Sequence, residues 1–133
     1  MQKYKKYITK GINESLPKVP FHKKAPIKRI SMLSKKTISE SKIHAAVHFV
    51  DLNNKKISKY SILHKHDVDE INMILSHDDK LVYEIQLGDE IYKVKSPATI
   101  FIPKSLKHKA DVISGRGIFM CLIMSNKYKT IKS

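Results

Sequence analysis

The stretch His64-Lys65-His66-Asp67-Val68-Asp69-Glu70 decides the interpretation of this chain, together with His108 further along. His64 and His66 lie on one face of a predicted strand, because side chains alternate along a strand. The polar residues between His66 and Glu70 can turn the chain, which places Glu70 on a neighbouring antiparallel strand. Counting His108, three ring nitrogens and one carboxylate can then converge inside a small barrel.

This set of side chains is suited to a divalent transition metal. Imidazole is a ligand for Fe, Zn, Ni and Cu, and a carboxylate adds a hard oxygen that also suits Mn or Fe(II). Four protein ligands leave one or two coordination positions for a substrate. The alternative is that the histidines only cap strands and hydrogen-bond one another. We predict one divalent ion of unspecified identity (Fe, Zn, Mn or Ni), held by His64, His66, Glu70 and His108.

Short predicted strands follow one another from residue 43 onwards. Their apolar segments alternate with polar turns, and no segment has a convincing helical pattern. We expect two hairpins, one around Gly88-Asp89 and one at the end of the series. Many short strands at even spacing indicate an all-β sandwich or a jelly-roll barrel. The predicted strands are 43–52, 57–66, 70–75, 81–87, 90–94, 99–102, 108–113 and 117–124.

Residues 42–125 resemble a small single-domain cupin. The family's motifs are Gly-x5-His-x-His-x3/4-Glu-x6-Gly and Gly-x5-Pro-x-Gly-x2-His-x3-Asn, and the four predicted ligands and Pro103 fall in register with them. The resemblance implies a cupin-type jelly-roll β-barrel (a double-stranded β-helix) in which these four residues bind metal. Other residues replace the supporting glycines and the asparagine, so we expect differently built loops. These positions are Ser58, His77, Pro97, Ser105 and Val112.

Residues 1–42 differ from the rest of the chain in charge and composition. They carry 12 basic and 2 acidic side chains, whereas residues 43–133 carry 14 and 10. Three prolines and little periodicity predict an extended, basic N-terminal arm, 1–42, ahead of a cupin barrel, 43–133. The arm has too many apolar residues for a disordered tail. We expect it to cover barrel edges, its own or a partner's, and to stabilise a homodimer.

The formal net charge of +14 is compatible with binding to nucleic acid or another anionic surface. Only Arg29 and Arg116 of the 26 basic residues are arginine, which is preferred for bidentate phosphate and guanine contacts. We therefore do not expect nucleic-acid binding. No apolar stretch has the length of a membrane span or of a signal peptide. The single cysteine, Cys121, lies in an apolar run, so we expect a buried thiol and a cytoplasmic protein with no membrane partner.

Three further side chains are candidates for the site. Asn72 shares the face of Glu70 and either orients a ligand, contacts substrate or is a satisfied core amide. Gln86 binds substrate if the polar face of its strand points inward, and lies on a solvated outer face if it does not. His48 either lines the mouth of the cavity or is a structural histidine.

The predicted site favours a metal-dependent enzyme that acts on a small oxygenated, anionic molecule. Oxygenation, decarboxylation and isomerisation are all reactions that such a metal supports. In this hypothesis Glu70 is both ligand and catalytic residue, and Asn72 and Gln86 bind substrate. The alternative is a non-catalytic cupin in which the metal anchors a small ligand or stabilises the barrel. The sequence does not decide between a dioxygenase, decarboxylase or isomerase and a binding protein, nor does it specify the substrate.

Overall fold

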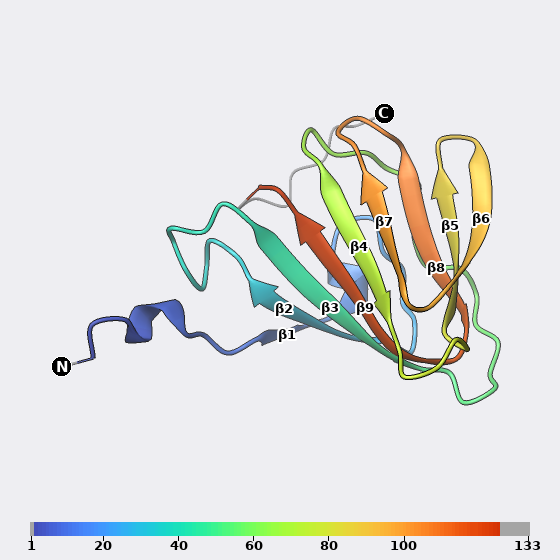
Figure 1. Cartoon of the computed structure of the whole chain (residues 1–133), viewed down its shortest axis with the longest axis horizontal. Coiled ribbons are helices and arrows are strands. Elements are labelled where there is room, and N and C mark those ends of the chain that lie inside the picture. The colour runs from blue at the N-terminus through green and yellow to red at the C-terminus, as the bar shows by residue number, and fades with distance from the viewer. Residues whose placement is uncertain (1, 126–133) are drawn as a thin grey trace.

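The computed structural model describes residues 2–125, which form two facing antiparallel β-sheets (Figure 1). The larger sheet has the strand order β1-β2-β3-β9-β4-β7, and the smaller has the order β6-β5-β8. The predicted all-β architecture, of the sandwich or jelly-roll kind, is confirmed. The strands are β1 (Ile12–Glu14), β2 (Lys28–Leu33), β3 (His44–Asp51), β4 (Glu70–Leu75), β5 (Val82–Leu87), β6 (Glu90–Lys95), β7 (Ala98–Ile102), β8 (His108–Ser114) and β9 (Arg116–Ile123).

Helical structure among the described residues is limited to two 3₁₀ turns, η1 (Lys5–Tyr7) and η2 (Leu16–Lys18). No helix in this part of the chain is long and apolar enough to cross a bilayer. The predicted hairpin around Gly88 is present as β5 and β6, with Leu87 opposite Glu90.

The predicted strand 57–66 is wrong. This segment is extended but forms isolated bridges, such as His22 with Ser61, instead of a continuous ladder. Side chains hold it: the backbone N–H groups of Tyr60 and Ser61 both donate to Asp111 Oδ1, at 2.8 and 2.9 Å. The alternating pattern did not reveal this, because side chains alternate in any extended segment whether or not its backbone pairs.

The predicted hairpin at the end of the series is also wrong, although both of its strands exist. β8 pairs with β5, whereas β9 pairs with β3 and β4, so the two strands lie in different sheets. Gly115 joins them with a φ of +94°. A Cβ at this position would lie 2.3 Å from the carbonyl oxygen of Lys80. Glycine therefore allows the chain to cross between the sheets where any side chain would collide.

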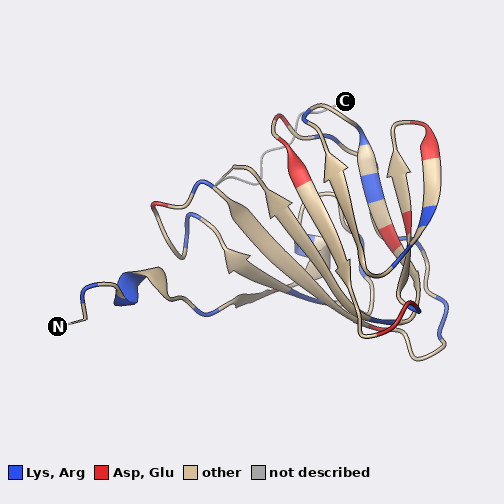
Figure 2. Cartoon of the chain, in the orientation of Figure 1, with Lys and Arg blue, Asp and Glu red and all other residues tan. Residues whose placement is uncertain are grey.

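Part of the predicted N-terminal arm belongs to the larger sheet. β1 pairs with β2 and β2 pairs with β3, so the barrel does not begin at residue 43. The signal of β2 is weak in the sequence because the side chains that it buries, Arg29 and Ser31, are polar. Residues 2–11 do extend away from the barrel in Figure 1. Figure 2 shows that Lys and Arg are spread over this N-terminal segment and several loops.

The interior of the barrel changes from polar to apolar along its strands. On β4 the buried side chains are Glu70 and Asn72 first and then Ile74, and on β3 His48 precedes Val50. β3 and β4 both pair antiparallel to β9, so they run in the same direction, and their buried polar residues His44 and Glu70 both lie opposite Ile123. Buried polar groups are costly without partners, so this polar end is where a site is expected.

Candidate metal centre

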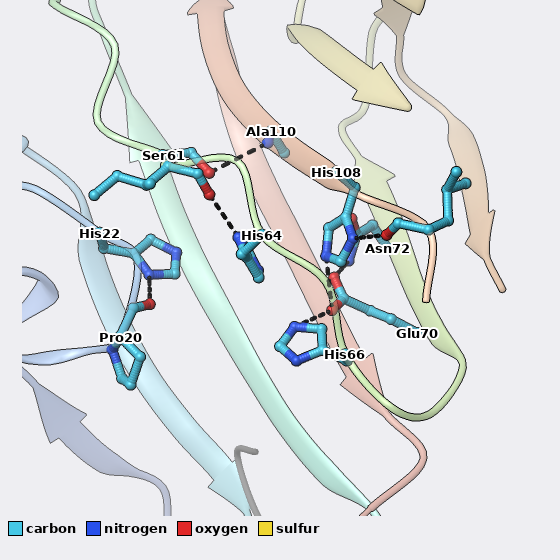
Figure 3. A network of polar contacts seen from close by, with 11 residues as sticks. Pro20, His22, Ser61, His64, His66, Glu70, Asn72, His108 and Ala110 are labelled. Atoms are coloured by element: carbon cyan, nitrogen blue, oxygen red, sulfur yellow. Dashed lines mark hydrogen bonds and ion pairs between the residues drawn. The ribbon is translucent and has the colours of Figure 1, made fainter. Parts of the chain in front are cut away.

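The structure brings together the four residues that were predicted to bind metal. His64, His66 and His108 are buried, and each offers a ligand atom, all within 4.8 Å of one another. Glu70 Oε1 lies 3.1 Å from His66 Nε2 and 3.3 Å from His108 Nε2. Figure 3 shows these two rings directed at the carboxylate of Glu70.

The four residues come from both sheets and from the segment that joins β3 to β4. His64 and His108 exchange backbone hydrogen bonds, with N···O distances of 3.1 and 2.8 Å. His108 begins β8 and Glu70 begins β4. The prediction that Glu70 lies on a strand beside 57–66 is wrong, since β4 pairs with β7 and β9. The residues therefore meet across the barrel rather than along one hairpin.

Backbone carbonyls orient two of the imidazole rings. Nδ1 of His64 donates to the Ile62 carbonyl at 2.5 Å, and Nδ1 of His108 donates to the Leu106 carbonyl at 2.9 Å. Because a carbonyl only accepts, Nδ1 carries the proton, and in the neutral ring Nε2 carries the lone pair. A hydrogen bond from the other ring nitrogen is the usual support for a metal-binding histidine.

Asn72 orients the carboxylate of Glu70. Its Nδ2 donates to Glu70 Oε2 at 2.8 Å, and both side chains are buried. The other oxygen of Glu70, Oε1, is the one near His66 and His108. Asn72 therefore lies on the inward face with Glu70, as the spacing of two residues predicted.

The protonation states of Glu70 and His64 suit metal ligands. Burial opposes ionisation of Glu70, but hydrogen bonds with His108, His66 and Asn72 outweigh it and hold the pKa of Glu70 well below its usual range. Burial also opposes charge on His108, yet its bond with Glu70 raises the pKa of His108. Burial lowers the pKa of His64 to about 4. Near neutral pH, Glu70 is a carboxylate and His64 is neutral, which are the forms that bind metal.

The spacing of the ligand atoms fits a transition-metal ion. Atoms in neighbouring positions around an ion with bonds of about 2.1 Å lie about 3 Å apart. The two distances from Glu70 Oε1, 3.1 and 3.3 Å, agree with this spacing. Three imidazoles and one carboxylate also match the ligand preferences of divalent first-row metals.

A cavity of about 30 Å³ adjoins this centre. Besides His64, Glu70, Asn72 and His108, its lining includes His22, Arg29, His48 and Cys121. The sequence predicted no role for His22 or Arg29, and it left the role of His48 open. The sequence did contain a signal for Arg29. The chain uses lysine at all but two of its basic positions, so an arginine is an exception that suggests a specific role. Cys121 is buried as expected, and burial raises its pKa.

Gln86 lies away from the centre. On β5, Tyr83 and Ile85 point into the core, so Gln86 faces outward, and its Nε2 donates to the Gly88 carbonyl at 2.9 Å. It does not line the cavity. The predicted contact of Gln86 with substrate is therefore not supported, and the alternative of an outer face describes it. The alternation shows which residues share a face but not which face points inward.

Solved structures with a similar arrangement of strands include several cupins. An RmlC-like cupin from Shewanella frigidimarina superposes with a TM-score of 0.54 at 16% identity, over 77% of this chain and 78% of that one. For KdgF from a Halomonas species the TM-score is 0.55 at 15% identity, over 77% and 81%. For the polyketide cyclase RemF from Streptomyces resistomycificus it is 0.60 at 14% identity, over 98% and 83%. The chain has the cupin fold. No protein-family model and no curated protein matches its sequence.

One departure from the cupin motif has a visible structural outcome. Ser105 stands where the motif has glycine, and its φ is +70°. This left-handed conformation is the one that favours glycine. The N–H of Ser105 donates to the His66 carbonyl at 2.8 Å, which connects the loop before His108 to the segment that carries His66. The backbone of this loop therefore keeps the conformation that favours glycine, although the residue at this position is serine.

Proposed function

We propose that this cupin binds one divalent transition-metal ion (Fe, Zn, Mn or Ni) through His64, His66, Glu70 and His108, and transforms a small oxygenated anion beside it. The observation that carries the proposal is the convergence of three buried histidines on one carboxylate. Two of the rings are already oriented by backbone carbonyls. RemF shows that a protein of similar fold can be an enzyme.

The ion, when bound, would act as a Lewis acid that polarises a carbonyl or carboxylate. The protein would supply neutral imidazole nitrogens and one negative charge. The low pKa of Glu70 makes it a weak base, so its catalytic role in this proposal is to balance charge rather than to take up a proton. Asn72 keeps Glu70 in place, and Phe21, stacked on His64 with ring centroids 4.6 Å apart, keeps water from that ring.

The reaction would be a decarboxylation or an isomerisation, which a single Lewis-acidic ion supports, or an oxygenation, which would also need O₂ and a redox-active ion such as Fe. The alternative is a non-catalytic cupin that holds a small ligand. The small size of the cavity, about 30 Å³, favours this alternative because only a few non-hydrogen atoms fit without movement of the walls. Both versions place a small anion next to the same four residues.

Ligand titration of the metal-loaded protein tests the proposal. Small hydroxy acids, keto acids and diketones are added to the Co(II) or Fe(II) form, and binding is followed by calorimetry and by the spectrum of the metal. We expect at least one class to bind and to change the spectrum, and product analysis then separates an enzyme from a binding protein. His77→Ala, at an exposed turn, is the matched control and should behave as wild type. If no ligand perturbs the metal, the proposal is wrong.

We further propose that the protein is a cytoplasmic homodimer. The projecting N-terminal segment, residues 2–11, exposes 65% of Tyr4, 48% of Tyr7 and 81% of Ile8. Contiguous apolar side chains of this kind usually mark an interface, and twofold pairing is the commonest arrangement. Deletion of residues 1–11 should yield a monomer by light scattering while the metal content stays the same. A full-length chain that is monomeric at micromolar concentration would contradict the dimer.

A further inference from the structure

We propose that Arg29 forms a second, anion-binding end of the metal cavity, so that the ligand is a small molecule with two acidic groups. One group would lie at the metal ligands and the other at Arg29. This inference rests on the proposed metal site and adds the substrate class, a small dicarboxylate.

Arg29 is the middle residue of a row that crosses three strands. Glu14 on β1 lies directly opposite Arg29 on β2, which in turn lies opposite His48 on β3. Arg29 Nε donates to Glu14 Oε1 at 3.1 Å, and its Nη1 lies 3.0 Å from His48 Nε2. The Arg29 side chain is only 2% exposed, whereas that of Glu14 is 33% exposed. The guanidinium is thus held inside the barrel, and its carboxylate partner lies nearer the surface.

Arg29 and the metal ligands line the same cavity. Its wall includes Arg29 and His48 together with His64, Glu70 and His108. A single small molecule in this cavity is therefore within reach of both groups. The bridge between His22 and Ser61 belongs to the same wall and connects the N-terminal part of the chain to the segment that carries His64.

The charges around the cavity favour an anion. Arginine stays protonated in proteins, and burying its charge is costly unless anions compensate it. The histidines beside it add no charge near pH 7, because burial lowers the pKa of His22 to about 4 and that of His48 well below its usual range. Lys109 lines the cavity as well. With a divalent ion facing the single carboxylate of Glu70, the cavity has an excess of positive charge, and Glu14 offsets only one unit of it.

The size of the cavity limits the ligand to a small one. A volume of about 30 Å³ admits only a few non-hydrogen atoms without movement of the walls. Arginine matches the two oxygens of a carboxylate with parallel N–H groups. A three-carbon diacid that chelates a metal through one carboxylate and a hydroxyl offers both acidic groups in a small molecule, and its binding requires the walls of the cavity to move apart.

Two acids that differ in one group test the inference. Lactate and hydroxymalonate share a three-carbon skeleton and a chelating hydroxy acid, but hydroxymalonate has a carboxylate where lactate has a methyl group. We expect the metal-loaded wild type to bind hydroxymalonate about tenfold or more tightly than lactate, because one additional charged hydrogen bond strengthens binding by about that factor. Arg29→Met should lose this preference and keep the affinity for lactate. Isothermal calorimetry measures both constants, with metal content determined on the same samples.

Glu14→Gln is the matched control, because it removes the ion pair of Arg29 and leaves the guanidinium. We expect it to keep or to increase the preference for hydroxymalonate. If Arg29 only ties β1 to β2, Glu14→Gln and Arg29→Met will have the same effect, and the inference is overturned. Arg29→Lys keeps the charge and should retain part of the preference for hydroxymalonate. If Arg29→Met does not fold, the comparison of Arg29→Lys with wild type takes its place.

The outcomes also separate this inference from the proposed function. If neither acid binds, or the wild type holds no metal, the proposed metal site has failed and the inference fails with it. If both acids bind equally well to the metal-loaded wild type, the metal site stands and the role of Arg29 is wrong.

Discussion

The two ends of the cavity are built in different ways. At the metal end, His64 and His66 lie on an extended segment with isolated bridges, and Glu70 and His108 are the first residues of their strands. At the other end, Arg29 and His48 lie within β2 and β3 and face each other in a regular ladder. The metal end therefore depends on side-chain and loop contacts, whereas the arginine end depends on strand register. Substitutions that remove an anchor should affect the two ends unequally.

The largest effect is expected for Asp111→Ala. Asp111 accepts the backbone N–H groups of Tyr60 and Ser61, ahead of the two metal-binding histidines of this segment. Without this carboxylate one buried and one partly buried donor lose their partner, which costs about 3 kcal/mol of the free energy of unfolding. Urea unfolding measures this loss, and metal affinity should fall as well. Asp111→Asn keeps an acceptor and should lose less, while unchanged metal affinity in Asp111→Ala would contradict the distinction between the two ends.

A pH effect of somewhat smaller size is expected at the arginine end. The folded-state pKa of His22 is lowered to about 4 by burial, from an ordinary value of 6.5. As the pH falls from 6.5 to 4, the unfolded chain takes up a proton at His22 that the folded chain does not, so stability that is present above pH 6.5 is lost in this window. The loss amounts to about 2–3 kcal/mol.

The matched comparison for this pH effect is His22→Gln. Thermal or urea unfolding between pH 4 and 7 should show a shallower decline for His22→Gln than for wild type, with the same metal content at pH 7. Identical pH profiles would show that His22 does not contribute.

The smallest effect is expected at Ser105, in the loop that precedes His108. Its φ of +70° strains any residue except glycine, so Ser105→Gly should raise the free energy of unfolding by about 1 kcal/mol. Metal affinity should not change. Ser39→Gly, at an exposed turn position outside the left-handed region, should not stabilise the protein. A destabilised Ser105→Gly variant would mean that the hydroxyl makes up for the strain.

Much of the metal end could be predicted from the sequence because His64, His66 and Glu70 follow one another at short spacing, and His108 falls in register with the second cupin motif. The strand segments could also be predicted, since alternation of apolar residues reports an extended chain. Pairing could not: β8 and β9 are adjacent in sequence but have their partners elsewhere, and no local pattern encodes that choice. The arginine end was missed because β2 buries Arg29 and Ser31, which look like exposed residues. The sequence left the position of Gln86 open, because alternation does not say which face is inside.

The most direct test of the central claim is the metal content of the purified protein and of the double variant His66→Ala/His108→Ala. Each lost ligand should weaken binding at least as much as the loss of a supporting hydrogen bond, which costs about 10–100-fold. We expect about one equivalent of a first-row metal in the wild type and in His77→Ala, and none in the double variant after dialysis, by mass spectrometry of the metal. Full stoichiometry in the double variant, or no metal in the wild type after loading, would contradict the metal centre described above.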